Sequence, residues 1–328
     1  MRRFFAVPIL VLAAAGAGFA AADNGLLALI PAESKIVTSV DVQQARSSPF
    51  GQFLLSRMNS DSNGFDKMAQ ETGFDPRRDL QSFVFASSGP AANVGQSSFV
   101  VVARGTFDSQ SIGKQVLSHG GTVQNFGGID VYVFQQQHGR SSAFALPDTG
   151  IAVFGDLASV QQVIANRANP AILDSALQNL ITQVSPNNDA WFASLLPGSF
   201  LTQHVNDATN QQVKTQAQAL QSVRQAAGGV RFGDLVQLTF DAVTRSPQDA
   251  VSLTDVVRFV ASLVQMQRQK DPKAGLLASA LDNMTMNTSG SNVHVSLAIA
   301  ETSIEQIADS GIGLNAHHRF KAARPSQR

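Results

Sequence analysis

Apolar and polar residues alternate in short segments that recur along the chain, and stretches with helical spacing separate these segments. Near the carboxyl end, Val293, Val295, Leu297 and Ile299 occupy every second position, so all four lie on one face of a strand. Short antiparallel strands with one apolar face need a cover on that face, which helices can supply. The pattern therefore predicts an α+β fold with antiparallel sheets covered on one face by helices.

The order strand, helix, hairpin, helix occurs twice, over residues 98–167 and again over residues 234–310. A glycine marks a hairpin turn in each run, at Gly127-Gly128 and at Ser289-Gly290. We therefore predict an internal repeat of two related strand-helix-hairpin-helix units. The predicted division of the chain is a signal peptide at residues 1–22, an N-terminal α+β domain at 23–185, a related C-terminal α+β domain at 186–312 and a mobile basic tail at 313–328.

Caps and breakers set the predicted helix boundaries. Asp156 begins one helix, and a second covers residues 172–184. The Gln-rich residues 213–223 predict a third helix, which Gly228-Gly229 stops. Residues 75–79 predict a loop, because the proline at position 76 disfavours helix in the residue before it. The helix that begins at Pro247 has a predicted buried stripe of Leu253, Val257, Val260 and Val264.

Residues 1–22 have the pattern of a secretory signal, with Arg2-Arg3 at the start, an apolar middle and a small-residue end. Ala20-Ala21-Ala22 fits an Ala-x-Ala cleavage site, which makes Asp23 the first mature residue. Gly18-Phe19-Ala20 offers a second cleavage site. The predicted location is periplasmic or secreted.

Two alternatives to ordinary cleavage and export stay open. The uncharged segment from Phe4 to Ala22 is about long enough to span a bilayer as an uncleaved anchor, although Ala and Gly make its second half weakly hydrophobic. Arg2-Arg3-Phe4-Phe5 partly matches a twin-arginine signal. After cleavage we expect no stable membrane insertion, because no later segment is apolar over a sufficient length.

Composition excludes several functional classes. The absence of cysteine removes disulfides, thiolate zinc sites, iron–sulfur clusters, cysteine nucleophiles and the lipid-bearing cysteine of a lipoprotein. Basic and acidic residues balance at 24 each without a long basic stripe, which argues against nucleic-acid binding. The chain has 21 Phe but only one Trp, Trp191, and one Tyr, Tyr132, so aromatic side chains suited to stack on sugars or bases are scarce.

Ser111-Ile112-Gly113-Lys114 matches Ser-x-x-Lys, the nucleophile motif of penicillin-recognising enzymes. A lysine one turn from a serine can accept its proton. The supporting Lys-Thr-Gly is missing, since Lys214-Thr215 is followed by Gln216. A solvated helix surface explains the motif better.

None of the histidines forms a His-x-x-x-His or His-Glu-x-x-His pattern, so we predict no metal site. His294 lies on the polar face of a predicted strand and is interpreted as an exposed side chain. His317-His318 is assigned to the solvated tail. The remaining histidines are His119, His138 and His204.

Arg77-Arg78 can bind an anion, but arginines between Asp75 and Asp79 more often form local ion pairs.

The chain has no nucleophile elbow, phosphate-binding glycine loop or dinucleotide fingerprint. A carboxylate pair for glycoside hydrolysis stays open because its spacing is spatial. We therefore predict no catalytic, cofactor-binding or metal-binding residue. Capping and turn formation explain the other prominent aspartates, Asp41, Asp108, Asp130 and Asp156.

Three segments carry a resemblance: Ile30-Pro31-Ala32-Glu33, Gly73-Phe74-Asp75-Pro76-Arg77-Arg78-Asp79-Leu80 and Val102-Ala103-Arg104-Gly105. The chain resembles uncharacterised exported bacterial proteins that contain a duplicated α+β domain of unknown function. The resemblance covers mainly the first half, and its motifs are structural. It implies an envelope or secreted protein without a known enzymatic activity.

These observations lead to one functional hypothesis with two alternatives. The leading hypothesis is an exported, non-enzymatic protein that binds another envelope or secreted protein at exposed sheet faces or edges. The first alternative is a carrier or sensor of an apolar ligand, which requires a closed apolar pocket. The second is an exported hydrolase that uses Ser111 and Lys114, with a third polar group beside them in a cleft.

Overall fold

The computed structural model describes residues 23–60, 63–89, 97–135, 141–196, 219–233, 235–268 and 272–309. The predicted signal peptide, the predicted basic tail and most of the Gln-rich segment lie outside these residues. So do His138, His204 and His317-His318.

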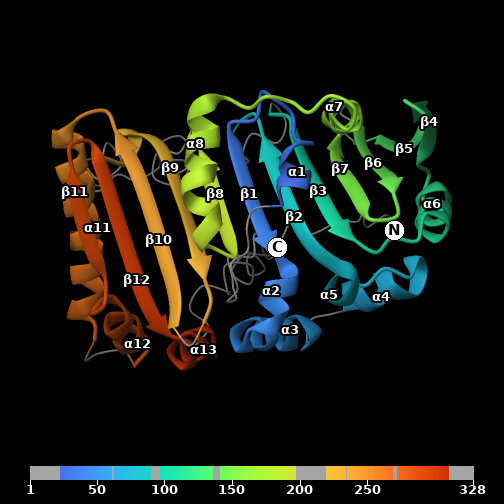
Figure 1. Ribbon diagram of the computed structural model, residues 1–328. Helices are drawn as coiled ribbons and strands as arrows, with labels where there is room; N and C mark the ends of the chain where they lie inside the picture. The colour runs from blue at the N-terminus through green and yellow to red at the C-terminus, as the bar shows by residue number, and fades with distance from the viewer. Residues whose placement is uncertain are drawn as a thin grey trace, which may run out of the picture.

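Within the described residues, twelve strands form one antiparallel sheet (Figure 1). Its strand order is β11-β12-β10-β9-β8-β1-β2-β3-β7-β6-β5-β4. The strands are β1 (Ile36–Asp41), β2 (Leu80–Ser87), β3 (Phe99–Gly105), β4 (Thr122–Phe126), β5 (Ile129–Gln135), β6 (Ser141–Asp148), β7 (Ile151–Asp156), β8 (Ala190–Ser194), β9 (Val223–Arg231), β10 (Leu235–Thr244), β11 (Thr285–Ser289) and β12 (Asn292–Ala300).

Helices lie on both faces of this sheet (Figure 1). They are α1 (Asn24–Leu27), α2 (Val42–Ser47), α3 (Pro49–Ser60), α4 (Asn63–Thr72), α5 (Pro76–Asp79), α6 (Ser109–Ser118), α7 (Leu157–Asn166), α8 (Ser175–Val184), the 3-10 turn η2 (Ser185–Asn187), α11 (Pro247–Met266), α12 (Pro272–Leu281) and α13 (Glu301–Asp309). The predicted α+β class with antiparallel strands is confirmed, and the two halves of the chain share a single sheet.

The junction of the two halves is the pair β1 and β8. Val37 of β1 is opposite Ala193 of β8, and the two strands run antiparallel. Outward from this pair, each half continues with a hairpin of two strands, β2-β3 on one side and β9-β10 on the other. Next to these hairpins lie β7 and β12, each the second strand of a later hairpin. Five strands of each half thus lie in the same order, β1-β2-β3-β7-β6 and β8-β9-β10-β12-β11, and β5 and β4 extend the first half beyond this common order.

The front face of the sheet, turned to the viewer in Figure 1, carries the largest core. Leu26 of α1, Val160 of α7 and Leu177 of α8 are fully buried against it. The back face carries separate clusters beneath α11, α6 and α3, which include Leu253, Ile112 and Phe50 respectively. Helices therefore cover both faces of the sheet, whereas the sequence predicted helices on one face only.

Helix α8 ends just before the predicted domain boundary between residues 185 and 186. It belongs to the N-terminal part by sequence, yet it packs on β8 and β9 of the C-terminal part. It begins three residues later than predicted, because Asp174 is its N-cap and accepts the N–H of Ala176. Ile172, predicted inside this helix, is 87% exposed.

The predicted helix stop at Gly228-Gly229 is wrong, because both glycines lie inside strand β9. A Cβ at position 228 would meet the carbonyl oxygen of Thr239 at 2.7 Å. A Cβ at position 229 would meet the side chain of Asn188 at 2.3 Å. Close approach of neighbouring chain segments, rather than a helix end, therefore explains these glycines.

Two other local predictions are corrected. Residues 76–79 form the short helix α5 in place of the predicted loop, since Pro76 occupies its first turn and Asp75 caps it. In α11 the fully buried residues are Ala250, Leu253 and Thr254, whereas Val260 is 50% exposed. Of the predicted buried stripe only Leu253 is buried, because Val257 and Val264 are half-buried and Val260 is exposed. The helices for which Asp156 and Pro247 set the start are confirmed.

Replacing Leu177 by Ala should remove the contact that holds α8 on the sheet. Truncation of a fully buried leucine leaves a cavity, so we expect the free energy of unfolding to fall by about 3 kcal/mol. Ile172→Ala, at an exposed site just before α8, is the matched control and should change it by less than about 0.5 kcal/mol. Urea unfolding measures both. Equal losses would show that α8 does not depend on this contact.

Candidate functional site

The Ser-x-x-Lys motif lies in the first turn of α6. The hydroxyl of Ser111 donates to Oδ2 of Asp108 at 2.6 Å, and Asp108 is the N-cap of the helix. This hydrogen bond holds the pKa of Asp108 below its ordinary value. Lys114 is exposed. The serine hydroxyl thus belongs to the cap of α6, and its hydrogen-bond acceptor is Asp108 rather than Lys114.

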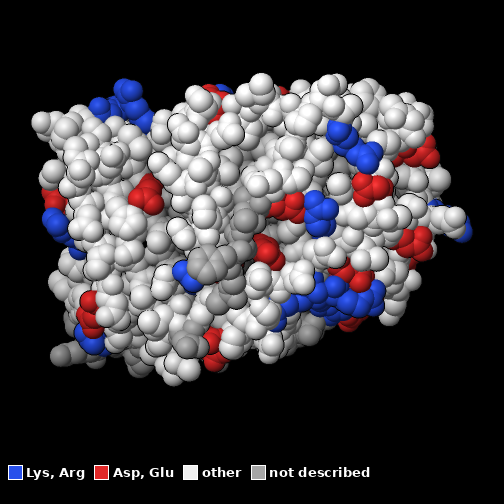
Figure 2. Space-filling view, in the orientation of Figure 1, with Lys and Arg blue, Asp and Glu red and all other residues white. Residues whose placement is uncertain are grey.

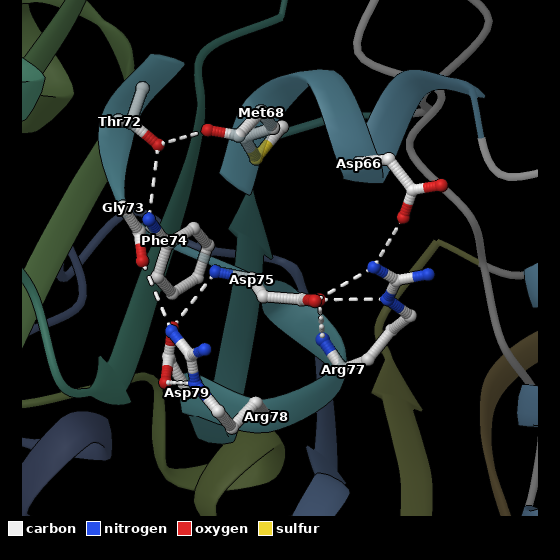
Figure 3. Close-up of polar contacts among 9 residues, drawn as sticks. All are labelled: Asp66, Met68, Thr72, Gly73, Phe74, Asp75, Arg77, Arg78 and Asp79. Atoms are coloured by element: carbon white, nitrogen blue, oxygen red, sulfur yellow. Dashed lines mark hydrogen bonds and ion pairs between the residues drawn. The ribbon is translucent and has the colours of Figure 1, made fainter. Parts of the chain in front are cut away.

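Arg77 lies between two carboxylates at the start of α5 (Figure 3). Its Nε donates to Oδ1 of Asp75 at 2.8 Å, and its Nη2 donates to Oδ2 of Asp75 at 2.7 Å. The same Nη2 lies 2.7 Å from Oδ1 of Asp66 in α4. Asp75 also caps α5, so it orients Arg77, and the Arg77–Asp66 ion pair links α5 to α4.

Arg78 pairs with the neighbouring aspartate (Figure 3). Its Nε lies 2.6 Å from Oδ1 of Asp79, and this hydrogen bond lowers the pKa of Asp79. Asp79 in turn accepts the backbone N–H of Asp75 at 2.8 Å. Both guanidinium groups therefore have carboxylate partners, which confirms the interpretation as local ion pairs.

A carboxylate–imidazole pair lies on the front face of the C-terminal half. Nδ1 of His294 in β12 is 2.7 Å from Oδ1 of Asp241 in β10. His294 is on the strand face that the sequence predicts. Its partner could not be foreseen, because only the register of β10 against β12 brings Asp241 opposite it.

An open groove of about 530 Å³ runs beside α8 over this part of the front face. We call it the amide groove, because five carboxamide side chains line it. Figure 2 shows few charged side chains over β9, β10 and β12, whereas charges gather over α4 and α5. The groove is lined by Ala176, Asn179, Leu180, Gln183, Gln225, Asp241, Ala242, Val243, Asn287, Ser289, Asn292, Val293 and His294.

The amides of this groove are available to a ligand or to water. Within the described part of the chain, no side-chain hydrogen bond engages any of the five carboxamides. A carboxamide offers two donor hydrogens and an acceptor oxygen, so the groove suits hydroxyl or amide groups better than ions. Among the lining residues, Asp241 is the only acidic one and His294 the only histidine, and the two side chains contact each other.

A smaller pocket of about 260 Å³ is lined by residues of β1, β2, β3 and β8 and by Asp23, the N-cap of α1, and we call it the Asp189 pocket. Asp189 is only 3% exposed, and its Oδ2 accepts the N–H of Phe232 at 3.0 Å. Burial raises the pKa of Asp189 to about 6; the Phe232 hydrogen bond opposes the rise, and the Asp41 carboxylate adds to it. The pocket is lined by Asp23, Ser39, Asp41, Gln43, Gln81, Ser82, Arg104, Asn188, Asp189 and Trp191.

Asp23 forms one wall of the Asp189 pocket. Its side chain caps α1 through the N–H of Leu26 and accepts hydrogen bonds from Arg104 at 2.6 and 3.0 Å. Burial, the largest single influence, opposes ionisation of Asp23, but the hydrogen bonds from Arg104, Leu26 and Ser82 and the charge of Arg104 together outweigh it and lower the pKa of this carboxyl. The residue predicted to begin the mature chain is therefore fixed to strand β3.

The two edges of the sheet are unprotected within the described residues. Strands β11 (Thr-Met-Asn-Thr-Ser) and β4 (Thr-Val-Gln-Asn-Phe) contain neither a charged residue nor proline. Most of their side chains are exposed. Edge strands in natural proteins commonly carry lysine, proline or a bulge that prevents pairing with another chain. Sequence reasoning identified both hairpins but could not show that they end the sheet.

In the described residues, no group of three or more His, Asp or Glu side chains could hold a metal ion. No helix in the same part of the chain is long and apolar enough to cross a membrane.

Comparison with known proteins supports the fold alone. No protein-family model matches the chain, and no curated protein matches it by sequence. A solved structure described as "Structure of crystal form III of TP0453" is similar, with a TM-score of 0.50, 11% sequence identity, and coverage of 87% of this chain and 97% of that one. Crystal form I of TP0453 gives a TM-score of 0.48 at the same identity and coverage. The resemblance to uncharacterised exported bacterial proteins stays a prediction.

Replacing Asp189 by Asn should stabilise the protein at neutral pH. Folding raises the pKa of this carboxyl from 3.8 to about 6, so its ionised form destabilises the fold above pH 6, and this penalty disappears as the pH falls towards 4. Asn keeps an acceptor for the Phe232 N–H. We expect a gain on the order of 2 kcal/mol at pH 7.5 and almost none at pH 4.

Urea unfolding at the two pH values measures this difference. Asp255→Asn, at an exposed site on α11, is the control and should show no comparable pH-dependent gain. A gain for Asp189→Asn of equal size at both pH values would contradict the assignment.

Proposed function

We propose that this chain is an exported, non-enzymatic protein that binds another protein by adding a strand to an edge of its sheet. The observation that carries the proposal is that both edges, β11 and β4, are exposed, uncharged and free of proline. Each edge offers a row of backbone N–H and C=O groups, which an extended segment of a partner can pair with.

Export rests on residues 1–22 and is supported by the position of Asp23. The sequence pattern favours cleavage before Asp23, for a periplasmic or secreted mature protein. Asp23, the residue that would follow this cleavage site, caps α1 and pairs with Arg104, so it is part of the folded structure.

The two alternative functions receive less support from the geometry. A carrier of an apolar ligand needs an enclosed apolar cavity, whereas the amide groove and the Asp189 pocket are open and lined by many polar side chains. A hydrolase needs Ser111 activated by Lys114, whereas Ser111 donates to Asp108. Binding by strand addition requires only an exposed edge strand, and β4 and β11 are such strands.

Capture of partners by edge variants tests the proposal. Tagged residues 23–328 are used to pull down proteins and lipids from the envelope extract of the source cells, identified by mass spectrometry. A double variant, Asn287→Lys with Gln124→Lys, places a charge at the centre of each edge and should lose the captured protein. Gln178→Lys, on the exposed side of α8, is the matched control and should retain it.

Two results would contradict the proposal. A partner captured equally by the double variant and the control would place binding elsewhere than the edges. A lipid or small apolar molecule captured without any protein would favour the carrier.

A further inference from the structure

We propose that the β11 edge binds a second copy of this chain, with the two β11 strands antiparallel about a two-fold axis at Asn287. The inference rests on the proposed function and names the partner for one of its two edges. Pairing in this way would join two sheets into one continuous sheet with the β4 edges at its ends.

The backbone of β11 has the hydrogen-bonding phase that this pairing needs. Ser289 and Asn292 close a two-residue turn in which Gly290 has φ +56°, so this pair exchanges hydrogen bonds. Hydrogen-bonded and non-bonded positions alternate along an antiparallel pair, so the N–H and C=O groups of Met286 and Thr288 point away from β12. These groups lie one residue to either side of Asn287.

A two-fold axis at Asn287 therefore satisfies all four outward groups. Met286 of one copy meets Thr288 of the second, and the same pair recurs on the other side of the axis. Each pair exchanges two hydrogen bonds, as in the widely observed antiparallel ladder. No register other than this one, centred on the strand, keeps every residue of the five-residue strand paired.

The side chains of β11 are compatible with facing their own copies. Asn287 would meet Asn287 of the second copy at a non-hydrogen-bonded position, where side chains are closest. A carboxamide both donates and accepts, so it complements itself, whereas a charged residue on the axis would face a like charge. None of the five residues is charged.

Two features within the chain favour pairing at this edge, one on each face of β11. The hydroxyl groups of Thr288 and Thr254 lie 3.1 Å apart, which ties the back of β11 to helix α11. On the front, Asn287 and Ser289 belong to the amide groove, whose carboxamides have no partner within the described residues. A two-fold axis here would bring the grooves of both copies together.

The β4 edge is less suited to the same arrangement. The side chain of Asn125 in β4 already donates to Asp130 of the adjacent strand at 3.2 Å. This carboxylate would place a negative charge on each side of an axis at Gln124, whereas the strand beside β11 carries no carboxylate at the matching positions. Gln124 is therefore a matched control position for Asn287.

Because the chain has no cysteine, a single introduced cysteine reports the pairing directly. In a non-hydrogen-bonded antiparallel pair the Cα atoms lie about 4.5 Å apart, within the range of a disulfide. Oxidation of Asn287→Cys should give a covalent dimer on non-reducing gels at least about tenfold faster than oxidation of Gln124→Cys. Equal rates for the two variants would overturn the proposal.

Solution mass provides the second test. Light scattering after size exclusion should show residues 23–328 as a dimer. Asn287→Lys should raise the dissociation constant at least about tenfold, and Gln124→Lys should leave it unchanged. Circular dichroism confirms that each variant is folded. A monomer at all concentrations would overturn self-association, and capture of another protein that still depends on Asn287 would leave the proposed function standing.

Discussion

The pairing of β1 with β8 is the interaction on which the rest of the molecule depends. It joins two halves of similar strand order into one antiparallel sheet, with Val37 opposite Ala193 and Ser39 opposite Trp191. These residues are buried, and the front core continues across the junction from α7 and α1 to α8. Without this pair, each half would expose its innermost strand as a hydrophobic edge.

The pairing of the two halves through β1 and β8 also determines which strands form the unpaired edges of the sheet. A single sheet has only two edges, and the hairpins β4-β5 and β11-β12 lie at them within the described residues. The outermost strands of these hairpins, β4 and β11, are short and uncharged, so their outward backbone groups are available for pairing. The same junction creates the Asp189 pocket, where burial beside Asp41 costs stability at neutral pH.

Local signals in the sequence predicted the elements better than their arrangement. Alternation predicted most of the strands but missed β9, and Asp156 and Pro247 marked helix starts because caps act within one turn. Gly228-Gly229 could not be placed, since the contacts that require glycine come from Asn188 and Thr239, far away in sequence. The pair of Asp241 and His294 depends in the same way on strand register, which no local pattern specifies.

Hydrogen–deuterium exchange across the junction tests the central claim most directly. If β1 and β8 hold one cooperative sheet, amides such as those of Thr38 and Phe192 should be among the slowest to exchange, and both halves should open with the same free energy. Fast exchange in β1 and β8, with each half opening at its own free energy, would contradict this account and show two independent domains.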